Sequence, residues 1–188
     1  MEMDTMEKMD TLEMDTLEKM DTMEKMGMLD MGTLALTYRM AAIGDIDLLA
    51  LTRTEFIIEM HGDMTDSQRA ELYESNKAYF AETLCSGEFL AYLAFDGDAL
   101  VATSGINFYK TPPAFKNLTG KTAYISNMYT KPDYRGRGIA TRLFEMTVME
   151  AKKRGCGRVE LIATNMGRPI YEKYGFEVMD GAMKYYFK

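Results

Sequence analysis

The sequence predicts an α/β (α+β) fold, in which helices cover both faces of a mixed, mainly antiparallel twisted sheet of about six to seven strands. The order of the segments is the first reason: a strand, two helices, three strands, a helix, a strand, a helix and closing strands. A turn at Asp96-Gly97-Asp98 joins two apolar runs as a hairpin, which makes those strands antiparallel. The helix after Gly138 connects two further strands, which a right-handed crossover makes parallel.

Each expected element follows from its residue types. Runs of β-branched, aromatic and other apolar residues bounded by turn residues predict strands, and apolar residues recurring every three or four positions predict helices. The strands are expected at residues 34–40, 89–95, 99–109, 122–130, 158–163, 176–179 and 182–187. The helices are expected at about residues 46–60, 67–84, 139–154 and 169–174. Asp45 and either Asp66 or Ser67 are the expected helix caps, and Gly155 ends the third helix.

Residues 1–32 form a tail of repeated Met, Asp, Thr and Glu residues ahead of a single domain at 33–188. The motif Met3-Asp-Thr-Met-Glu-Lys8 recurs with small changes, so that Met or Leu falls mostly at every third position. A step of three spreads an apolar stripe around a helix, so the tail is expected to be a fraying helix or disordered. It is either a methionine-rich partner-binding surface or a repeat expansion upstream of a start near Met28 or Met31, and the second is favoured.

Composition and charge exclude several classes of protein. Ten acidic residues and three lysines in the tail account for the whole net charge of −7, which leaves a neutral domain and argues against a nucleic-acid-binding face. No apolar run is long enough to cross a membrane, and the charged N-terminus is unlike a signal peptide, so a cytoplasmic protein is expected. Cys85 and Cys156 are expected to be free thiols, and His61 without a Cys/His cluster predicts no metal site.

The turn between the strand at 122–130 and the next helix reads Arg135-Gly136-Arg137-Gly138-Ile139-Ala140. A strand, a glycine-containing turn and a helix present free backbone N–H groups and the positive end of the helix dipole to an anion. The two glycines remove side chains that would keep a phosphate away, and the two arginines add positive charge. The spacing is not the Gly-x-Gly-x-x-Gly dinucleotide pattern. The turn therefore predicts a pyrophosphate site of another kind.

This hexapeptide is similar to Arg/Gln-x-x-Gly-x-Gly/Ala, the acetyl-CoA pyrophosphate loop of the GNAT N-acetyltransferases. Two further segments share the resemblance. Asn127-Met-Tyr-Thr-x-Pro-x-Tyr-Arg-Gly136 resembles the central strand running into that loop, and Asn165 followed by Ile170-Tyr-Glu-Lys-Tyr-Gly-Phe176 resembles the closing helix and strand. The three motifs occur in the family's order over roughly residues 34–187. The chain thus resembles a GNAT acetyltransferase, with the GNAT-like sheet described above.

The resemblance implies a site for acetyl-CoA as acetyl donor. The pantetheine arm would lie between two parallel strands, paired with the backbone of Met128 and Thr130. An N–H near Met128 or Tyr129 would polarise the thioester carbonyl. Asn165 would reach the pantetheine or the adenine side. The pyrophosphate would be held by Arg135, Gly136, Arg137, Gly138, Ile139, Ala140 and Thr141. Without the motif, Met128 and Tyr129 would be interpreted as core residues and Asn165 as a helix cap.

Tyr171 is the candidate catalytic residue, because it stands four residues before Gly175, where GNAT enzymes commonly carry a tyrosine. The departing CoA thiolate benefits from a proton donor, and a phenol with an ordinary pKa of about 10 suits a thiol with a pKa of about 8.5. The alternative is a structural tyrosine that packs its ring in the core.

No general base is evident from the sequence. Members that acetylate protein lysines often carry a carboxylate where Tyr124 stands here, so its absence argues against a protein-lysine acceptor. Glu88, His61, a water chain or an amine with a lowered pKa are the alternatives. Phe56, Met60, Phe108, Tyr109 and Phe115 are candidates for an apolar wall of the acceptor site, with a place in the core as the equal alternative.

The acceptor is expected to be a small-molecule primary amine, by analogy at the level of the fold. Two other functions are kept: an acyltransferase acting on a protein or aminoacyl-tRNA, and a non-catalytic acyl-CoA-binding regulatory module. A homodimer is a candidate assembly, because exposed edge strands of this fold often pair between subunits.

Overall fold

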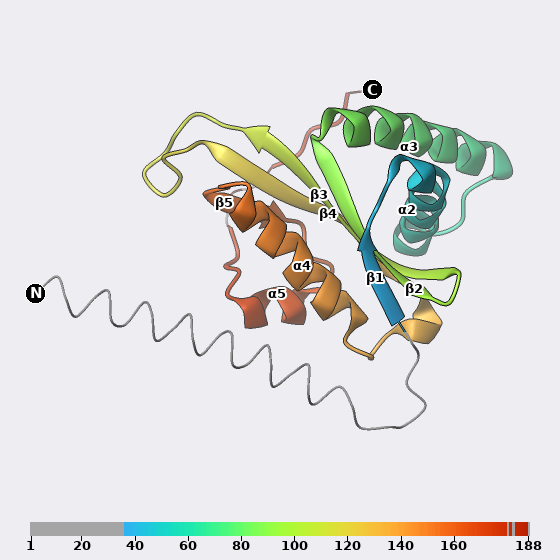
Figure 1. Ribbon diagram of the computed structural model, residues 1–188. Helices are drawn as coiled ribbons and strands as arrows, with labels where there is room; N and C mark the ends of the chain where they lie inside the picture. Colours follow the sequence, from blue (N-terminus) through green and yellow to red (C-terminus); the bar gives the residue numbers. More distant parts are fainter. Residues whose placement is uncertain (1–35, 180, 182, 188) are drawn as a thin grey trace, which may run out of the picture. The chain divides into compact units, whose positions relative to one another are not determined.

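The structure is a computed structural model that describes residues 36–179, 181 and 183–187. The predicted tail at residues 1–32 lies outside the described residues, so the interpretations of its structure, function and translation start stay predictions. Within the described residues, five strands form one sheet (Figure 1). The strands are β1 (Leu36–Met40), β2 (Phe89–Asp96), β3 (Ala99–Lys110), β4 (Lys121–Thr130) and β5 (Arg158–Leu161).

The sheet is mixed and mainly antiparallel, as the sequence predicts. Its strands lie in the order β1-β2-β3-β4-β5, and the first three pairings are antiparallel. The predicted hairpin at Asp96-Gly97-Asp98 joins β2 to β3, with Asp96 paired to Ala99. The last pairing, between β4 and β5, is parallel, and the helix that connects them makes the crossover that parallel strands require.

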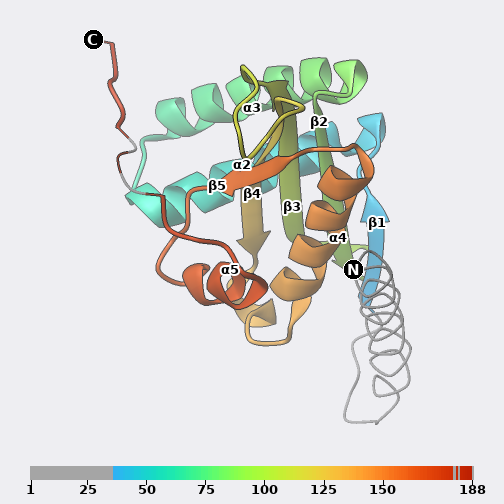
Figure 2. The same ribbon diagram turned by 90° about the vertical axis from the view of Figure 1, so that its left-hand side faces the viewer.

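Helices cover both faces of the sheet. Figure 2 shows α4 and α5 in front of the strands, and α2 and α3 behind them. The helices are α2 (Ile46–His61), α3 (Asp66–Ser86), α4 (Ile139–Lys153) and α5 (Arg168–Tyr174), with 3₁₀ turns η1 (Ile43–Asp45) and η2 (Pro132–Tyr134). β2 is buried on both faces, which explains its continuous apolar run. Phe89 and Leu93 pack with Leu49 and Phe80 of α2 and α3, while Leu90 packs in the cluster on the α4 side.

The starts of the first two helices differ in part from the predicted caps. Asp45 is the N-cap residue of α2, as expected, but its carboxylate accepts no hydrogen bond from the helix. It pairs instead with Arg39, at 2.7 Å for both oxygens, and accepts a hydrogen bond from the N–H of Ala42. The second helix is capped by Thr65 in a capping box with Gln68, not by Asp66 or Ser67. The carboxylate binds the guanidinium rather than the N–H groups of the helix end. Hydrogen bonds between two opposite charges are stronger than those to a neutral N–H group.

The closing strands expected at 176–179 and 182–187 are not found among the described residues of those ranges. Val178, Met179, Met183, Tyr185 and Phe187 are exposed there. A strand needs a partner strand as well as a suitable sequence, and these residues form no ladder with β5. The fold class is confirmed, and the strand count within the described residues is five rather than six to seven.

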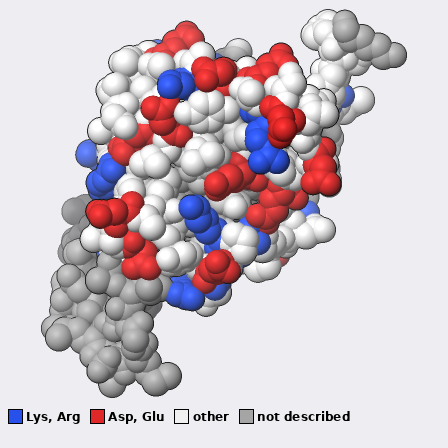
Figure 3. All heavy atoms as spheres, turned by 90° about the vertical axis from the view of Figure 1, so that its right-hand side faces the viewer, with Lys and Arg blue, Asp and Glu red and all other residues white. Residues whose placement is uncertain are grey.

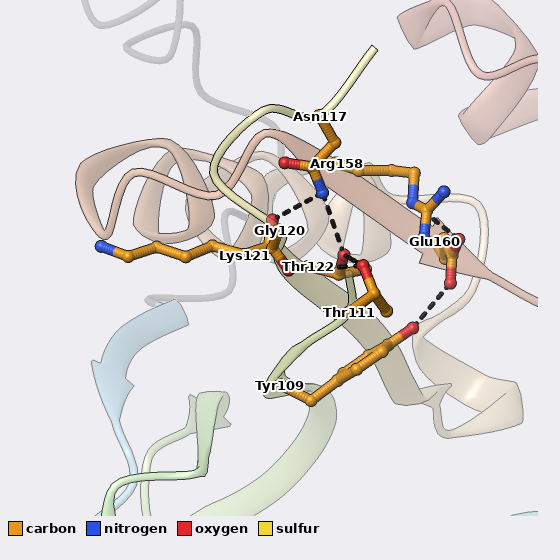
Figure 4. Close-up of polar contacts among 8 residues, drawn as sticks. All are labelled: Tyr109, Thr111, Asn117, Gly120, Lys121, Thr122, Arg158 and Glu160. Atoms are coloured by element: carbon orange, nitrogen blue, oxygen red, sulfur yellow. Dashed lines mark hydrogen bonds and ion pairs between the residues drawn. The ribbon is translucent and has the colours of Figure 1, made fainter. Parts of the chain in front are cut away.

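The long loop between β3 and β4 is held in place by polar contacts (Figure 4). The buried side chain of Asn117 donates hydrogen bonds to the carbonyl of Lys121 at 3.1 Å and to Thr122 Oγ1 at 3.2 Å. Beside the loop, the hydroxyl of Tyr109 donates to Glu160 of β5 at 2.7 Å, and Arg158 pairs with the same carboxylate. These contacts tie the loop to the start of β4 and β5.

Charged side chains of both signs are interspersed over the face shown in Figure 3. This face therefore carries no continuous basic stripe. Among the described residues, no helix is both long enough and apolar enough to cross a membrane.

Candidate active site

The strands β4 and β5 diverge part-way along the sheet. Their parallel pairing runs from Thr122–Arg158 to Ile125–Leu161 and ends there. β4 continues to Thr130, so its last five residues have no partner on the β5 side within the described chain. Residues 126–130 still run beside β3 on their other side, so their β5-facing edge can accept an extended ligand as an additional strand. The resemblance implies that a pantetheine arm would lie beside this stretch of β4.

A β-bulge interrupts β4 within the unpaired stretch. The register between β3 and β4 shifts between Thr103 and Gly105, so that Asn127 and Met128 together lie opposite Ser104. Asn127 has a φ of 54°, in the left-handed region that asparagine tolerates better than most residues. A bulge leaves a residue out of the ladder and redirects its backbone groups. It lies where the sequence predicts the N–H that polarises the thioester carbonyl.

The N-terminus of α4 offers backbone N–H groups without a competing cap. Gly138 is the N-cap residue with a φ of 76°, no side chain caps the helix, and its first turn holds no acidic residue. Gly136 has a similar φ of 75°. A Cβ at either glycine would meet no atom within 4 Å, so the space in front of the helix is open. This geometry suits an anion such as a pyrophosphate.

The turn before α4 is held by side chains on both sides. The hydroxyl of Tyr134 donates to Asp96 at the β2–β3 turn, at 2.8 Å. Arg135 Nε donates to the carbonyl of Thr130 at 2.9 Å, and Arg137 donates to the carbonyl of Asp133 at 2.8 Å. The turn is therefore positioned before any ligand binds.

A cavity of about 700 Å³ connects these features. It is bounded by α2, the unpaired part of β4, the turn before α4 with the first residues of that helix, the end of β5 and α5. Most of the predicted site residues line it, namely Met128, Tyr129, Thr130, Arg135, Gly136, Gly138, Ile139, Ala140, Thr141 and Tyr171. Arg137 and Asn165 are absent from the lining: Arg137 lies over the ring of Tyr134, and Asn165 is exposed between Thr164 and Met166.

Tyr171 of α5 lies deep in the cavity wall. Its side chain is 7% exposed and packs against Phe144 and Phe176, with ring centroids 5.1 and 6.3 Å away. Gly167 leaves room for the hydroxyl, since a Cβ there would lie 3.1 Å from it. Burial raises the pKa of Tyr171 above its ordinary value of 10, so the phenol is protonated near neutral pH. Such a group can donate a proton.

Only part of the expected acceptor wall lies at the cavity. Phe56 and Met60 line it, as do Tyr124 and His61. Phe108 packs in the core on the α4 side, because β3 turns it to that face of the sheet. Tyr109 is held by Glu160, and Phe115 is 95% exposed on the loop before β4. Glu88 lies at the start of β2, beside Ser86 and outside the cavity lining.

The sequence analysis did not predict several charged or polar lining residues, which include Arg53, Glu59, Ser126, Asn127 and Lys184. Glu59 of α2 is the carboxylate among the lining residues that the structure describes, and it binds Arg135 through both oxygens at 2.7 Å. Arg53 of α2 lines the other side of the cavity. Asn127 is 3% exposed, and its amide has no hydrogen-bond partner among the described residues. The unusual backbone of Asn127 has no sequence signal, and a helix pattern does not reveal which charged residues face a cavity.

Comparison with known proteins agrees with this geometry. The sequence model of the acetyltransferase (GNAT) family matches residues 54–176, which include the second half of α2, the bulge, the turn before α4 and Tyr171. The chain belongs to the GNAT acetyltransferase family. The family predicted from the motifs is thereby confirmed.

Solved structures and characterised relatives of this GNAT protein support the same assignment. A predicted acetyltransferase from Clostridium acetobutylicum, solved with acetyl-CoA, is 35% identical with a TM-score of 0.72, covering 80% of this chain and 96% of its own. A GCN5-related N-acetyltransferase from Ralstonia eutropha JMP134 is 25% identical with a TM-score of 0.73, covering 81% and 99%. Thialysine N-epsilon-acetyltransferase of Mus musculus is 26% identical over 78 residues, or 42% of this chain. The chain spans only 44% of the length of that relative.

Proposed function

We propose that this GNAT protein is an acetyl-CoA-dependent N-acetyltransferase that acts on the primary amine of a small molecule. The observation that carries the proposal is the single cavity that joins the uncapped N-terminus of α4 to the unpaired stretch of β4. The first feature suits a pyrophosphate and the second suits a pantetheine arm. The Clostridium acetobutylicum relative was solved with acetyl-CoA, which supports the choice of donor.

Acetyl-CoA would extend from the N-terminus of α4 to the stretch of β4 that has no described partner on the β5 side. Its pyrophosphate would accept hydrogen bonds from the backbone of the turn at residues 135–141, where Gly136 and Gly138 leave open space. The pantetheine amides would pair with the backbone of Met128 and Thr130. The thioester carbonyl would then lie at the bulge, where an N–H near Met128 or Tyr129 stabilises the oxyanion. Asn165 would contact the donor only if its exposed side chain turned towards the cavity.

The chemical step is a direct transfer. The amine nitrogen attacks the thioester carbonyl carbon, forms a C–N bond and produces a tetrahedral oxyanion. The oxyanion collapses, the C–S bond breaks, and the CoA thiolate takes a proton from the hydroxyl of Tyr171. The nitrogen loses its extra proton to Glu59, to His61 or to water in the cavity, and Tyr171 regains its proton from solvent. The products are an acetylated amine and CoA thiol.

The acceptor would enter from the side of α2, where Phe56 and Met60 form the remaining apolar wall. The mouse relative is named for transfer to the ε-nitrogen of thialysine. We extend from that name only the class of acceptor, a small molecule with a primary amine.

The test is CoA thiol release by the full chain, measured with acetyl-CoA and a panel of primary amines. The proposal expects thiol release that depends on the amine, together with a mass increase of one acetyl group in the amine. Thiol release that is absent with every amine, while acetyl-CoA still binds, would instead support a non-catalytic acyl-CoA-binding module. Activity confined to a peptide or an aminoacyl-tRNA would overturn the choice of acceptor.

A further inference from the structure

Arg53 on α2 is a partly buried arginine that lines the cavity without a counterion. Within the described residues, its guanidinium forms no ion pair and donates no hydrogen bond. Arg135, the other arginine in the described lining, is paired with Glu59. Its guanidinium lies 5.3 Å from the ring centroid of Phe56. Burial lowers the pKa of Arg53, and the ionisable groups that act on this pKa are the phenols of Tyr124 and Tyr79.

A guanidinium in this position lacks the partner that its charge requires. Burial of a charge is unfavourable unless a counterion or several hydrogen bonds compensate for it. The ionisable groups that act on Arg53 are the phenol hydroxyls of Tyr124 and Tyr79, and neither is a carboxylate that could neutralise its charge. The planar fork of the guanidinium matches a carboxylate, which it binds through two parallel hydrogen bonds. The site therefore suits a ligand that carries its own carboxylate into the cavity.

The phosphates of the donor are not this ligand, because they belong at the opposite end of the cavity. Arg53 and Glu59 are six positions apart on α2, which corresponds to about 9 Å along the helix axis. Glu59 contacts Arg135 in the turn that would hold the pyrophosphate. Tyr124, which lines the cavity together with Arg53, precedes Met128 by about 13 Å along β4. Arg53 thus lies on the side of the acetyl group that is remote from the phosphates.

Further polar side chains near Arg53 come from β3, from β4 and from α3, which covers this face of the sheet. Ser126 of β4 donates to Asn107 Oδ1 of β3 at 3.0 Å, and the amide of Asn107 contacts the hydroxyl of Tyr79. Ser126 and Tyr124 line the cavity together with Arg53. The single proton of the Ser126 hydroxyl is already donated to Asn107, so the hydroxyl of Tyr124 is the additional donor for a bound carboxylate.

We propose that Arg53 binds a carboxylate of the acceptor, so that the substrate is an amino-acid-like molecule whose reacting amine lies several bonds from that carboxylate. This inference rests on the proposed acetyl transfer and specifies its substrate class. An α-amine lies too close to its own carboxylate to reach the bulge while the carboxylate contacts Arg53. An ω-amine on a chain of several methylenes spans the distance and lies against Phe56.

The experiment measures binding of two matched amines to the full chain saturated with CoA. ε-Aminocaproate carries a carboxylate at the end opposite its amine, and hexylamine has a chain of similar length without one. The wild type is expected to bind ε-aminocaproate about tenfold or more tightly than hexylamine, as one charge-assisted bidentate contact predicts. Arg53→Gln is expected to remove this preference, and Arg53→Lys to retain part of it. The control is Arg69→Gln on α3, an exposed arginine outside this cavity, which should keep the full preference.

The result that overturns the inference is equal binding of the two amines by the wild type, or an unchanged preference in Arg53→Gln. Thiol release on the same proteins separates this outcome from failure of the proposed function. Thiol release with both amines, without a preference for the amine that carries a carboxylate, would contradict the role of Arg53 and leave acetyl transfer standing. Preference for ε-aminocaproate without any thiol release would contradict acetyl transfer and leave the carboxylate site standing. In kinetics, Arg53→Gln should raise KM for ε-aminocaproate about tenfold and leave KM for hexylamine and acetyl-CoA unchanged.

Discussion

Glu59 on α2 holds Arg135 in the turn between β4 and α4, with both carboxylate oxygens 2.7 Å from Nη2 of the arginine. The sequence predicted that Arg135 would add positive charge to the pyrophosphate turn. In the structure, that charge is already offset by a carboxylate, and the Nε of Arg135 is bound to the carbonyl of Thr130. The attraction for an anion therefore comes mainly from the backbone N–H groups at the start of α4.

Replacing Glu59 with Gln should tighten acetyl-CoA binding by about two- to fivefold, because a negative charge near the phosphates is removed and Arg135 is freed. Calorimetric titration of acetyl-CoA measures the effect. Glu71→Gln, an exposed change on α3, is the matched control and should have no effect. Weaker binding in Glu59→Gln would show that Glu59 matters by orienting Arg135.

Replacing Gly138 with Glu should abolish acetyl-CoA binding. The new carboxylate would lie in the open space at the start of α4, and the φ of 76° adds about 1–2 kcal/mol of strain for any residue with a Cβ. Gly87→Glu carries the same kind of strain, at a φ of 74°, at the end of α3 and outside the cavity. Equal thermal destabilisation of both variants, with binding lost only in Gly138→Glu, is the expected pattern. Retained affinity in Gly138→Glu would contradict the pyrophosphate assignment.

Replacing Tyr171 with Phe should lower the rate of thiol release about a hundredfold, because the thiolate loses its proton donor. Acetyl-CoA affinity and thermal stability should change little, since the ring contacts with Phe144 and Phe176 are kept. Tyr174→Phe is the control, because Tyr174 lies on the same short helix and also packs on Phe144, but is 46% exposed. Equal rates in both variants would indicate a structural role for Tyr171.

The raised pKa of Tyr171 has a consequence at alkaline pH. Its pKa in the folded state exceeds the unfolded value of 10. The protonated phenol therefore makes its full contribution to the free energy of unfolding below pH 10, and this contribution is lost as pH rises through the folded pKa. Thermal unfolding above pH 10 should therefore show a smaller loss of stability in Tyr171→Phe than in the wild type. For the same reason, deprotonation of Tyr171 should not reduce thiol release below pH 10. Parallel stability curves for the two proteins would contradict the burial of this phenol.

The bulge at Asn127 is testable through its backbone. Asn127→Val should destabilise the fold by about 1–2 kcal/mol, because a β-branched residue resists the φ of 54°. Asn127→Gly should be at least as stable as the wild type, since it relieves the strain and removes a buried amide without a partner. Thiol release should fall in the Val variant more than its unfolded fraction explains. Full activity of folded Asn127→Val would argue against a role for the bulge.

Much of this architecture was predictable from local sequence. The hairpin at Asp96-Gly97-Asp98, the turn with Gly136 and Gly138, and Tyr171 each belong to a short pattern whose chemistry is recognisable without the fold. Contacts between distant segments were not predictable. Glu59 and Arg135 are 76 positions apart, and their pairing depends on how α2 lies over β4. From the sequence, Arg53 is interpreted as a polar residue of an ordinary helix, and only the fold shows that it lines the same cavity as Tyr124.

Three further features have the same physical origin. The cap expected from Asp45 depends on whether a stronger partner lies nearby, and Arg39 is that partner. The closing strands around Tyr185 depend on a neighbouring strand edge, which no periodicity within the segment reveals. The bulge at Asn127 follows from the register between β3 and β4, and a register is a property of two strands together.

Thermal unfolding of the full chain with and without acetyl-CoA tests the central claim most directly. A ligand present at a hundred times its dissociation constant adds about 2.7 kcal/mol to the stability of the folded state, which raises the Tm of a domain of this size by several degrees. The account predicts such a rise for the wild type and none for Gly138→Glu. An unchanged Tm of the wild type at millimolar acetyl-CoA would contradict it.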